Sequence, residues 1–231
     1  METKKVEWQL VILVCSIIII MIMGVRQSLG LFLEPITNFM NNGKEFFSFA
    51  IGVQAIIWGL VTFFLGILID KFGPQKVLAF GIISFASGIF LMSNPTSEFT
   101  LFSATTLMGF GLGGAGMATM VSIAGKVAPV NKRSLAMGLV AAAASFGQFA
   151  VVLPTMWMNK AFGWETSLIV LASVVIGLLI FLPLLSSTNN KSSSAQDFGN
   201  NLQQTIMFSL REKNYILLIS GFFVCGFHVT F

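Results

Sequence analysis

An all-α integral membrane fold is predicted by three features of this sequence. Of its 231 residues, 55% are apolar and only 10% are charged, whereas about a quarter of the residues of a water-soluble domain are charged. The mean hydropathy is +0.88. The apolar residues gather in runs that are long enough to cross a bilayer as a helix, which takes roughly 20 residues.

The runs predict six complete spans and a seventh that stops short. The first run is too long for the apolar core of a cleavable signal peptide, so we expect it to be a permanent span. Pro154 is expected to kink the fifth span, and Pro35 and Pro183 are expected to mark helix ends. The predicted spans cover residues 8–33, 46–69, 77–93, 99–124, 135–158, 166–185 and 214–231.

These runs divide the chain into three parts. Residues 1–185 form a predicted six-helix bundle, and residues 186–213 form a polar, low-complexity linker. Residues 214–231 are apolar up to Phe231, and no polar cap or flanking charge closes them. We expect this last segment to be an incomplete seventh helix, broken in mid-span.

Lys and Arg are distributed unevenly between the two sides of the predicted spans. The outer loops hold Lys44 and Lys160, Arg26 lies inside a span, and the other ten basic residues fall on the side of the N-terminus. Because cytoplasmic loops are enriched in Lys and Arg, the N-terminus is predicted to be cytoplasmic. The ten are Lys4, Lys5, Lys71, Lys76, Lys126, Lys132, Arg133, Lys191, Arg211 and Lys213.

The composition argues against several other classes of protein. The net charge is +4, but the 13 basic residues are dispersed, which does not indicate a nucleic-acid partner. Cys15 and Cys225 lie in separate apolar runs, without the spacing of a metal site or a disulfide framework. The sequence has no Ser/His/Asp grouping and no paired buried carboxylates, so we expect neither enzymatic activity nor a cofactor.

Small residues recur at helical spacing within the spans. In lipid, close approach of backbones at small residues holds helices together. These stripes are therefore predicted to be helix-packing faces. They comprise Gly52, Gly59 and Gly66 in the second span, Gly81 and Gly88 in the third, Gly109, Gly111, Gly113, Gly114 and Gly116 in the fourth, and Ala141 to Ala144 in the fifth.

Arg26 is the strongest candidate for a binding residue. It lies deep in the first span, where a cation costs about 2.5–3.5 kcal/mol on insertion scales and must face a cavity or a partner. No acid of the six spans is placed to neutralise it, since Glu34 lies two helical turns outward. Arg26 either attracts a carboxylate substrate in a water-filled cavity, or has a structural role at the outer surface or beside an acid beyond these spans.

Other polar and aromatic residues could line the same cavity. Gln148 shares a face of the fifth span with Ser145, and Gln54 shares a face of the second span with Trp58. Hydrogen bonding between helices would give the same pattern. His228, in the seventh run, could likewise line a pathway or bond a neighbouring helix.

Charge, glycine and proline meet between the second and third spans, over Gly66, Asp70, Lys71, Gly73 and Lys76. The Gly73-Pro74 pair forces a tight reversal there. The spacing Gly-x-x-x-Asp-Lys-x-Gly-x-x-Lys resembles the loop between helices 2 and 3 of the major facilitator superfamily. Residues 24–33, GVRQSLGLFL, are similar to the first helix of the bacterial monocarboxylate and oxalate–formate-type carriers of that superfamily. Further similarity lies in residues 131–138, 145–148, 162–164 and 221–228.

The resemblance implies a carrier of twelve helices in two bundles, of which this chain holds the N-terminal six and whose C-terminal bundle is its partner. It implies location in the inner membrane and secondary active transport of small organic anions, mono- or dicarboxylates, by alternating access. Arg26 falls where these carriers place a substrate-associated Lys or Arg. One departure is that the fourth helix opens with Thr105 to Gly109 and lacks the Arg that the superfamily associates with proton coupling.

We interpret the loop residues Gly66, Asp70, Lys71, Gly73 and Lys76 as a conformational latch that bonds helix ends on the cytoplasmic side. The alternative is that their charges only set the topology. Three other functions remain open. They are a drug or sugar facilitator in which Arg26 has a coupling or structural role, a non-transporting membrane sensor or scaffold, and an inert half-carrier.

Overall fold

The computed structural model describes residues 8–41 and 43–188, together with Leu217 and Gly221. The chain divides into two compact units, residues 1–190 and 191–231. Of the predicted seventh span, 214–231, only Leu217 and Gly221 are described, and both are helical. His228 lies outside the described residues, so the three-part division of the chain and the place of His228 stay predictions.

All regular structure in the described residues is helical, and six segments are long and apolar enough to cross a membrane. The predicted all-α membrane fold is therefore confirmed. The second span ends at Ile69 and the sixth at Leu185, each shortly before its helix ends. The helices that form the six spans are, in order, α1 (Trp8–Ser28) with η1 (Leu29–Phe32) and α2 (Leu33–Met40); α3 (Lys44–Phe72); α4 (Pro74–Met92); α5 (Glu98–Ala115) with α6 (Met117–Val127); η2 (Val130–Lys132) with α7 (Arg133–Ala150) and α8 (Val152–Phe162); and α9 (Trp164–Gly177) with η3 (Leu178–Thr188).

Two of the expected helix ends were wrong. Pro35 does not end the first span, because it lies in the first turn of α2, where the missing N–H of a proline has no helical partner to lose. The span continues to Met40 and closes at Asn41, which has a left-handed φ of 55°. Pro183 lies inside η3 rather than at its end.

The fourth and fifth spans are interrupted. The expected kink at Pro154 is present, since α7 ends at Ala150 and Pro154 lies in the first turn of α8. The break in the fourth span at Gly116, between α5 and α6, has no counterpart in the expected boundaries. There the hydroxyl of Thr119 donates a hydrogen bond to the carbonyl of Gly113, 3.3 Å away, which satisfies one acceptor that the break leaves free.

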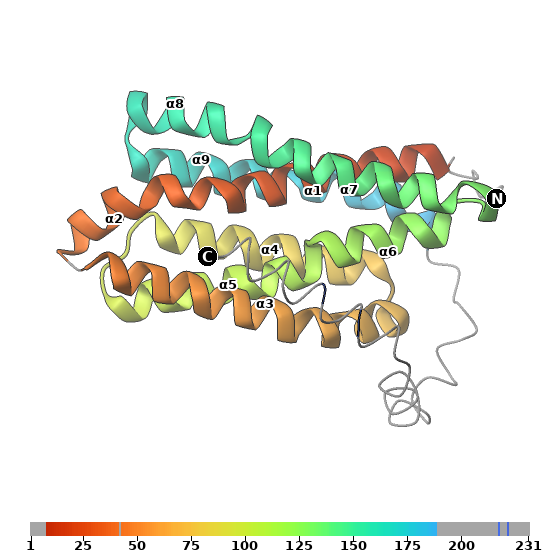
Figure 1. Ribbon diagram of the computed structural model, residues 1–231, viewed down its shortest axis with the longest axis horizontal. Coiled ribbons are helices and arrows are strands. Elements are labelled where there is room, and N and C mark those ends of the chain that lie inside the picture. Colours follow the sequence, from red (N-terminus) through yellow and green to blue (C-terminus); the bar gives the residue numbers. More distant parts are fainter. Residues whose placement is uncertain (1–7, 42, 189–216, 218–220, 222–231) are drawn as a thin grey trace. The chain divides into compact units, whose positions relative to one another are not determined.

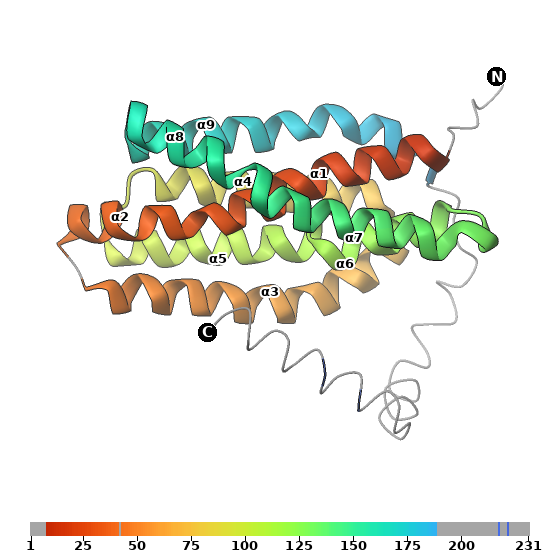
Figure 2. The same ribbon diagram turned by 45° about the horizontal axis from the view of Figure 1, so that its top comes forward.

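The spans lie side by side and alternate in direction (Figures 1 and 2). We call the end of the bundle where α1 begins the Trp8 end, and the end where α2 finishes the Met40 end. At the Trp8 end α3 turns into α4 through Gly73, and at the Met40 end α8 turns into α9 through Gly163. Both glycines have a φ of 84°, a conformation that L side chains rarely adopt.

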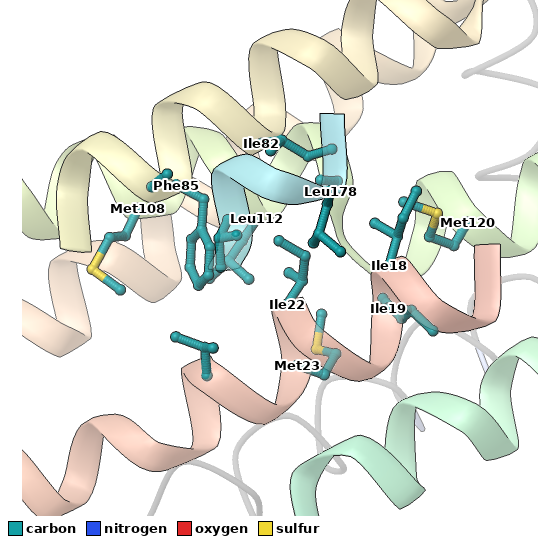
Figure 3. Packing of buried hydrophobic residues seen from close by; sticks show 14 of the residues in the cluster. Ile18, Ile19, Ile22, Met23, Ile82, Phe85, Met108, Leu112, Met120 and Leu178 are labelled. Carbon is teal, nitrogen blue, oxygen red and sulfur yellow. The ribbon is translucent and has the colours of Figure 1, made fainter. Parts of the chain in front are cut away.

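The core of the bundle is a continuous apolar cluster between α1, α4, α5, α6 and the sixth span. Side chains of α1 meet those of α4 and α5 at its centre, and Leu178 of η3 joins them (Figure 3). Ten of its members are labelled in Figure 3: Ile18, Ile19, Ile22, Met23, Ile82, Phe85, Met108, Leu112, Met120 and Leu178.

Glycines lie where helices approach closely, as the stripes of the third and fourth spans predict. A Cβ built on Gly81 would lie 2.6 Å from the backbone nitrogen of Ala115, and one on Gly111 would lie 2.5 Å from that of Phe85. The side chain of a larger residue would therefore force α4 and α5 apart. Between α1 and α7 the same role falls to Gly24 and Gly147.

The stripe of the second span does not follow this pattern. A Cβ on Gly52, Gly59 or Gly66 would meet no atom within 4 Å. No described helix lies against this stripe, so its role in helix packing stays a prediction. Spacing shows that a helix face is bare, but it does not show whether a second helix lies against that face.

Candidate functional site

Arg26 lies in the last turn of α1, within the interior of the 33-residue span Trp8–Met40. Its side chain is half-buried. The guanidinium carbon lies over the indole ring of Trp58 on α3, 4.8 Å from the ring centroid. A cation over a tryptophan face is stabilised by roughly 0.5–2 kcal/mol, more where water is excluded. The structure therefore brings two predicted site residues from separate spans into contact.

Two buried donors at this place have no hydrogen-bond partner in the described structure. They are Nε of Arg26 and Nε2 of Gln54. Gln54 is only 1% exposed and precedes Trp58 by one helical turn, so both side chains lie on the same face of α3. Leaving a buried donor unpaired costs about 1–3 kcal/mol, which a ligand with acceptor oxygens would recover.

No described carboxylate forms an ion pair with Arg26. Glu34, the acid in the same membrane span, is exposed on α2. Arg26 thus carries its charge among apolar helices with an aromatic face as its described neighbour. A guanidinium binds a carboxylate through two parallel N–H···O bonds, so the chemistry of this place suits an organic anion.

Glycines of the fourth span hold Gln54 and Trp58 in position. A Cβ on Gly109 would lie 2.9 Å from the carbonyl oxygen of Gln54, and one on Gly116 would lie 3.3 Å from Nε1 of Trp58. Trp58 therefore lies between the guanidinium of Arg26 and the break that separates α5 from α6. The glycine run in the sequence signalled close packing here, but not which side chains it would position.

Gln148 is not brought into contact with these residues. It is exposed on α7 and makes no hydrogen bond in the described structure. Its neighbour Gly147 packs against Ile20 of α1, and a Cβ on Gly24 would reach Val151, the residue between α7 and α8, at 2.5 Å. This packing places Gln148 near the level of Arg26 along the bundle, and its predicted role in binding stays a prediction.

The predicted latch residues lie at the Trp8 end, but not in a loop. Asp70 and Lys71 belong to the last turns of α3, and Lys76 belongs to the first turn of α4. Only Gly73 stands between the two helices, so the expected reversal at Gly73-Pro74 is confirmed. The apolar span ends at Ile69 as predicted, and α3 continues beyond it to Phe72. Gly66 has open space where a side chain would be.

Sequence comparison shows where this arrangement belongs. A model of the Major Facilitator Superfamily matches residues 13–231, which is nearly the whole chain. The chain belongs to the major facilitator superfamily. The predicted superfamily is therefore confirmed, while the oxalate–formate branch within it stays a proposal.

Among related members of the superfamily, an uncharacterised MFS-type transporter, YcxA of Bacillus subtilis, is 25% identical over 97% of this chain and 55% of its own length. The agnestins efflux protein AgnL12 of Paecilomyces divaricatus is 27% identical over 71% of this chain and 36% of its own length. The vesicular acetylcholine transporter of Drosophila melanogaster is 31% identical over 62% of this chain and 26% of its own length. The chain spans about half the length of these superfamily relatives, or less.

Two side chains that sequence reasoning missed join the spans of this superfamily member. Nδ2 of Asn159 on α8 donates to the carbonyl of Leu31 on η1, 3.4 Å away. Nε2 of Gln75 on α4 donates to the carbonyl of Leu182 on η3, 2.7 Å away. The second bond attaches the start of α4, beside the predicted latch, to the sixth span. The sequence shows only polar residues at helix ends, without a sign of their partners.

Proposed function

We propose that this chain is the N-terminal bundle of a secondary transporter that moves small organic anions, mono- or dicarboxylates, by alternating access. The observation that carries the proposal is the half-buried Arg26, stacked on Trp58, whose Nε has no partner in the described structure. Superfamily membership supports transport, and an unpaired cation supports an anionic substrate.

In this proposal three side chains bind the substrate. Arg26 pairs with the carboxylate, Trp58 fixes the guanidinium plane, and Gln54 donates its free Nε2 hydrogen to a further acceptor. Gln148 and His228 complete the pathway. A C-terminal bundle of the same carrier supplies the opposing wall of the cavity.

The orientation and the latch belong to the same proposal. The described residues place Lys71, Lys76, Lys126, Lys132 and Arg133 at the Trp8 end, whereas the Met40 end has Lys44 and Lys160. By the enrichment of basic residues in cytoplasmic loops, the Trp8 end faces the cytoplasm of an inner membrane. Gly66, Asp70, Lys71, Gly73 and Lys76 then form a latch on that side, which opens when the bundles rock.

The test is uptake of a panel of labelled carboxylates by the full-length protein in proteoliposomes. Losing a hydrogen bond to a charged group costs about 1.5–3 kcal/mol, so Arg26→Ala is expected to lower kcat/KM about 10- to 150-fold. Arg26→Lys keeps the charge but loses the planar fork and the stacking. Its kcat/KM should therefore lie between those of the unsubstituted protein and Arg26→Ala. Arg133→Gln, an exposed arginine at the Trp8 end, is the control. Undiminished carboxylate uptake by Arg26→Ala refutes the anion assignment.

One observation favours a second candidate, efflux of a larger organic molecule. AgnL12 is named as an efflux protein, and an aromatic face beside a cation suits planar ligands. Export of such compounds with no carboxylate uptake would favour this candidate. Binding without translocation would instead indicate a sensor. A protein that neither binds nor transports these compounds would be an inert half-carrier.

A further inference from the structure

An open groove lies at the Trp8 end, apart from Arg26. It has a volume of about 500 Å³, within the range of about 300–1,000 Å³ that is usual for ligand sites. Its walls come from α3 and α4, and Phe110 of α5 also lines it. The lining residues are Val61, Phe64, Leu65, Leu68, Phe72, Lys76, Val77, Phe80 and Phe110.

The lining is apolar except for one charge. Leu65, Ile69 and Val77 form a small buried cluster with Val61 that is separate from the main core. This cluster supports the groove, while aromatic side chains beside it remain open, with Phe64 60% exposed. Lys76 is the charged residue of the lining and is exposed.

The length of the groove corresponds to one leaflet of a bilayer. Along α3 it extends from Val61 to Phe72, which at 1.5 Å per residue is about 16 Å. The hydrocarbon core of a bilayer is about 30 Å thick, so one leaflet measures about 15 Å. An acyl chain lying in the groove would therefore have its headgroup at the level of Lys76.

Basic residues outnumber acidic ones at that end of the groove, where Lys71 and Lys76 stand against Asp70. Lys76 has no carboxylate partner among the described side chains, and Nζ of Lys71 lies over the ring of Phe72, 5.5 Å from its centroid. The helix α4 begins at Pro74, so the positive end of its dipole also lies here. A zwitterionic headgroup would leave this charge unmatched, whereas an anionic phosphate complements it.

We propose that this groove binds one acyl chain of an anionic phospholipid whose phosphate lies on Lys76. The site requires only that the bundle spans a membrane, and it does not depend on the substrate proposed for Arg26. Basic pockets between transmembrane helices bind anionic headgroups by the same combination of charge and apolar depth.

Native mass spectrometry of the full-length protein, released from micelles containing either phosphatidylglycerol or phosphatidylcholine, tests the proposal. We expect a retained phosphatidylglycerol molecule. Lys76→Gln should weaken its retention about fivefold, the effect of one basic residue near an anionic surface. Lys160→Gln, at the Met40 end, should leave it unchanged.

A matched pair of residues tests the groove itself. Leu68 lines it and is 38% exposed, whereas its neighbour Ile67 is 37% exposed and does not line it. Leu68→Trp should displace the lipid and Ile67→Trp should not. Equal retention of both lipids, no retained lipid, or equal behaviour of the two tryptophan variants overturns the proposal. Lys76→Gln changes an exposed side chain, so its result holds even if Leu68→Trp does not fold.

Discussion

The contact between α1 and α7 allows a test of backbone packing at a glycine, separate from the effect of glycine on helix propensity. Gly147 and Gly138 both lie in α7. A Cβ on Gly147 would lie 2.8 Å from the backbone carbonyl carbon of Ile20 and nearer still to its oxygen, whereas one on Gly138 would meet no atom within 4 Å. Gly147→Ala is therefore expected to push two helices apart, and Gly138→Ala is not.

The size of the effect follows from comparing the two variants. Replacing glycine by alanine in a helix raises the free energy of unfolding by about 0.5–1 kcal/mol at either position. This contribution cancels when the stabilities of the two variants are compared. Overpacking against an unyielding backbone costs about 1–3 kcal/mol. For a unit of 150–250 residues, each kcal/mol shifts Tm by about 2–4 °C. Gly147→Ala should therefore unfold about 2–12 °C below Gly138→Ala.

Scanning fluorimetry of the two full-length variants, purified in one detergent, measures this difference directly. Gly138→Ala should also match or slightly exceed the unsubstituted protein. Equal melting temperatures for the two alanine variants would show that α1 and α7 do not meet at Gly147. The packing that places Gln148 near the level of Arg26 would then have no basis.

Three further variants test other contacts. Gln75→Leu removes the hydrogen bond to Leu182 and should destabilise the protein by about 1 kcal/mol; a melting temperature equal to that of the unsubstituted protein would show that the bond contributes nothing. Gly163→Ala strains a φ of 84° and should cost about 1–2 kcal/mol, whereas Gly177→Ala, a helical site with open space, should cost nothing; identical thermal scans contradict this. Trp58→Leu removes the aromatic face and should raise KM for the transported anion about two- to thirtyfold, and an unchanged KM in the uptake assay would show that the stacking does not support binding.

The fold was largely predictable because a membrane imposes one strong constraint. A helix must have about 20 apolar residues to cross, and each run of that length within the described residues is a span. The ends were less predictable, since Pro35 and Asp70 lie inside helices that continue beyond the apolar run. Polar residues or proline can extend a helix into the interface. A prediction from the length of the apolar run leaves these residues out of the helix.

The candidate site was predictable only in part. A charge inside an apolar span is rare enough to be noticed by itself, so Arg26 stood out. Trp58 stood out through its spacing from Gln54, but its contact with Arg26 depends on how α1 and α3 pack, which no spacing within one helix encodes. Asn159 and Gln75 donate hydrogen bonds to backbone carbonyls in distant spans. Because every residue has a backbone carbonyl, the sequence does not show which one accepts such a bond.

The same distinction explains why the structure confirms one glycine stripe and leaves another a prediction. Both stripes state only that a helix face lacks side chains. The stripe of α5 meets Gln54, Phe85 and Gly81 because α3 and α4 lie against it, whereas a Cβ on the stripe of α3 would meet no described atom within 4 Å. Periodicity is thus a property of one helix, and contact is a property of two. An interpretation from sequence becomes secure only where two helices carry complementary faces, as Gly24 and Gly147 do.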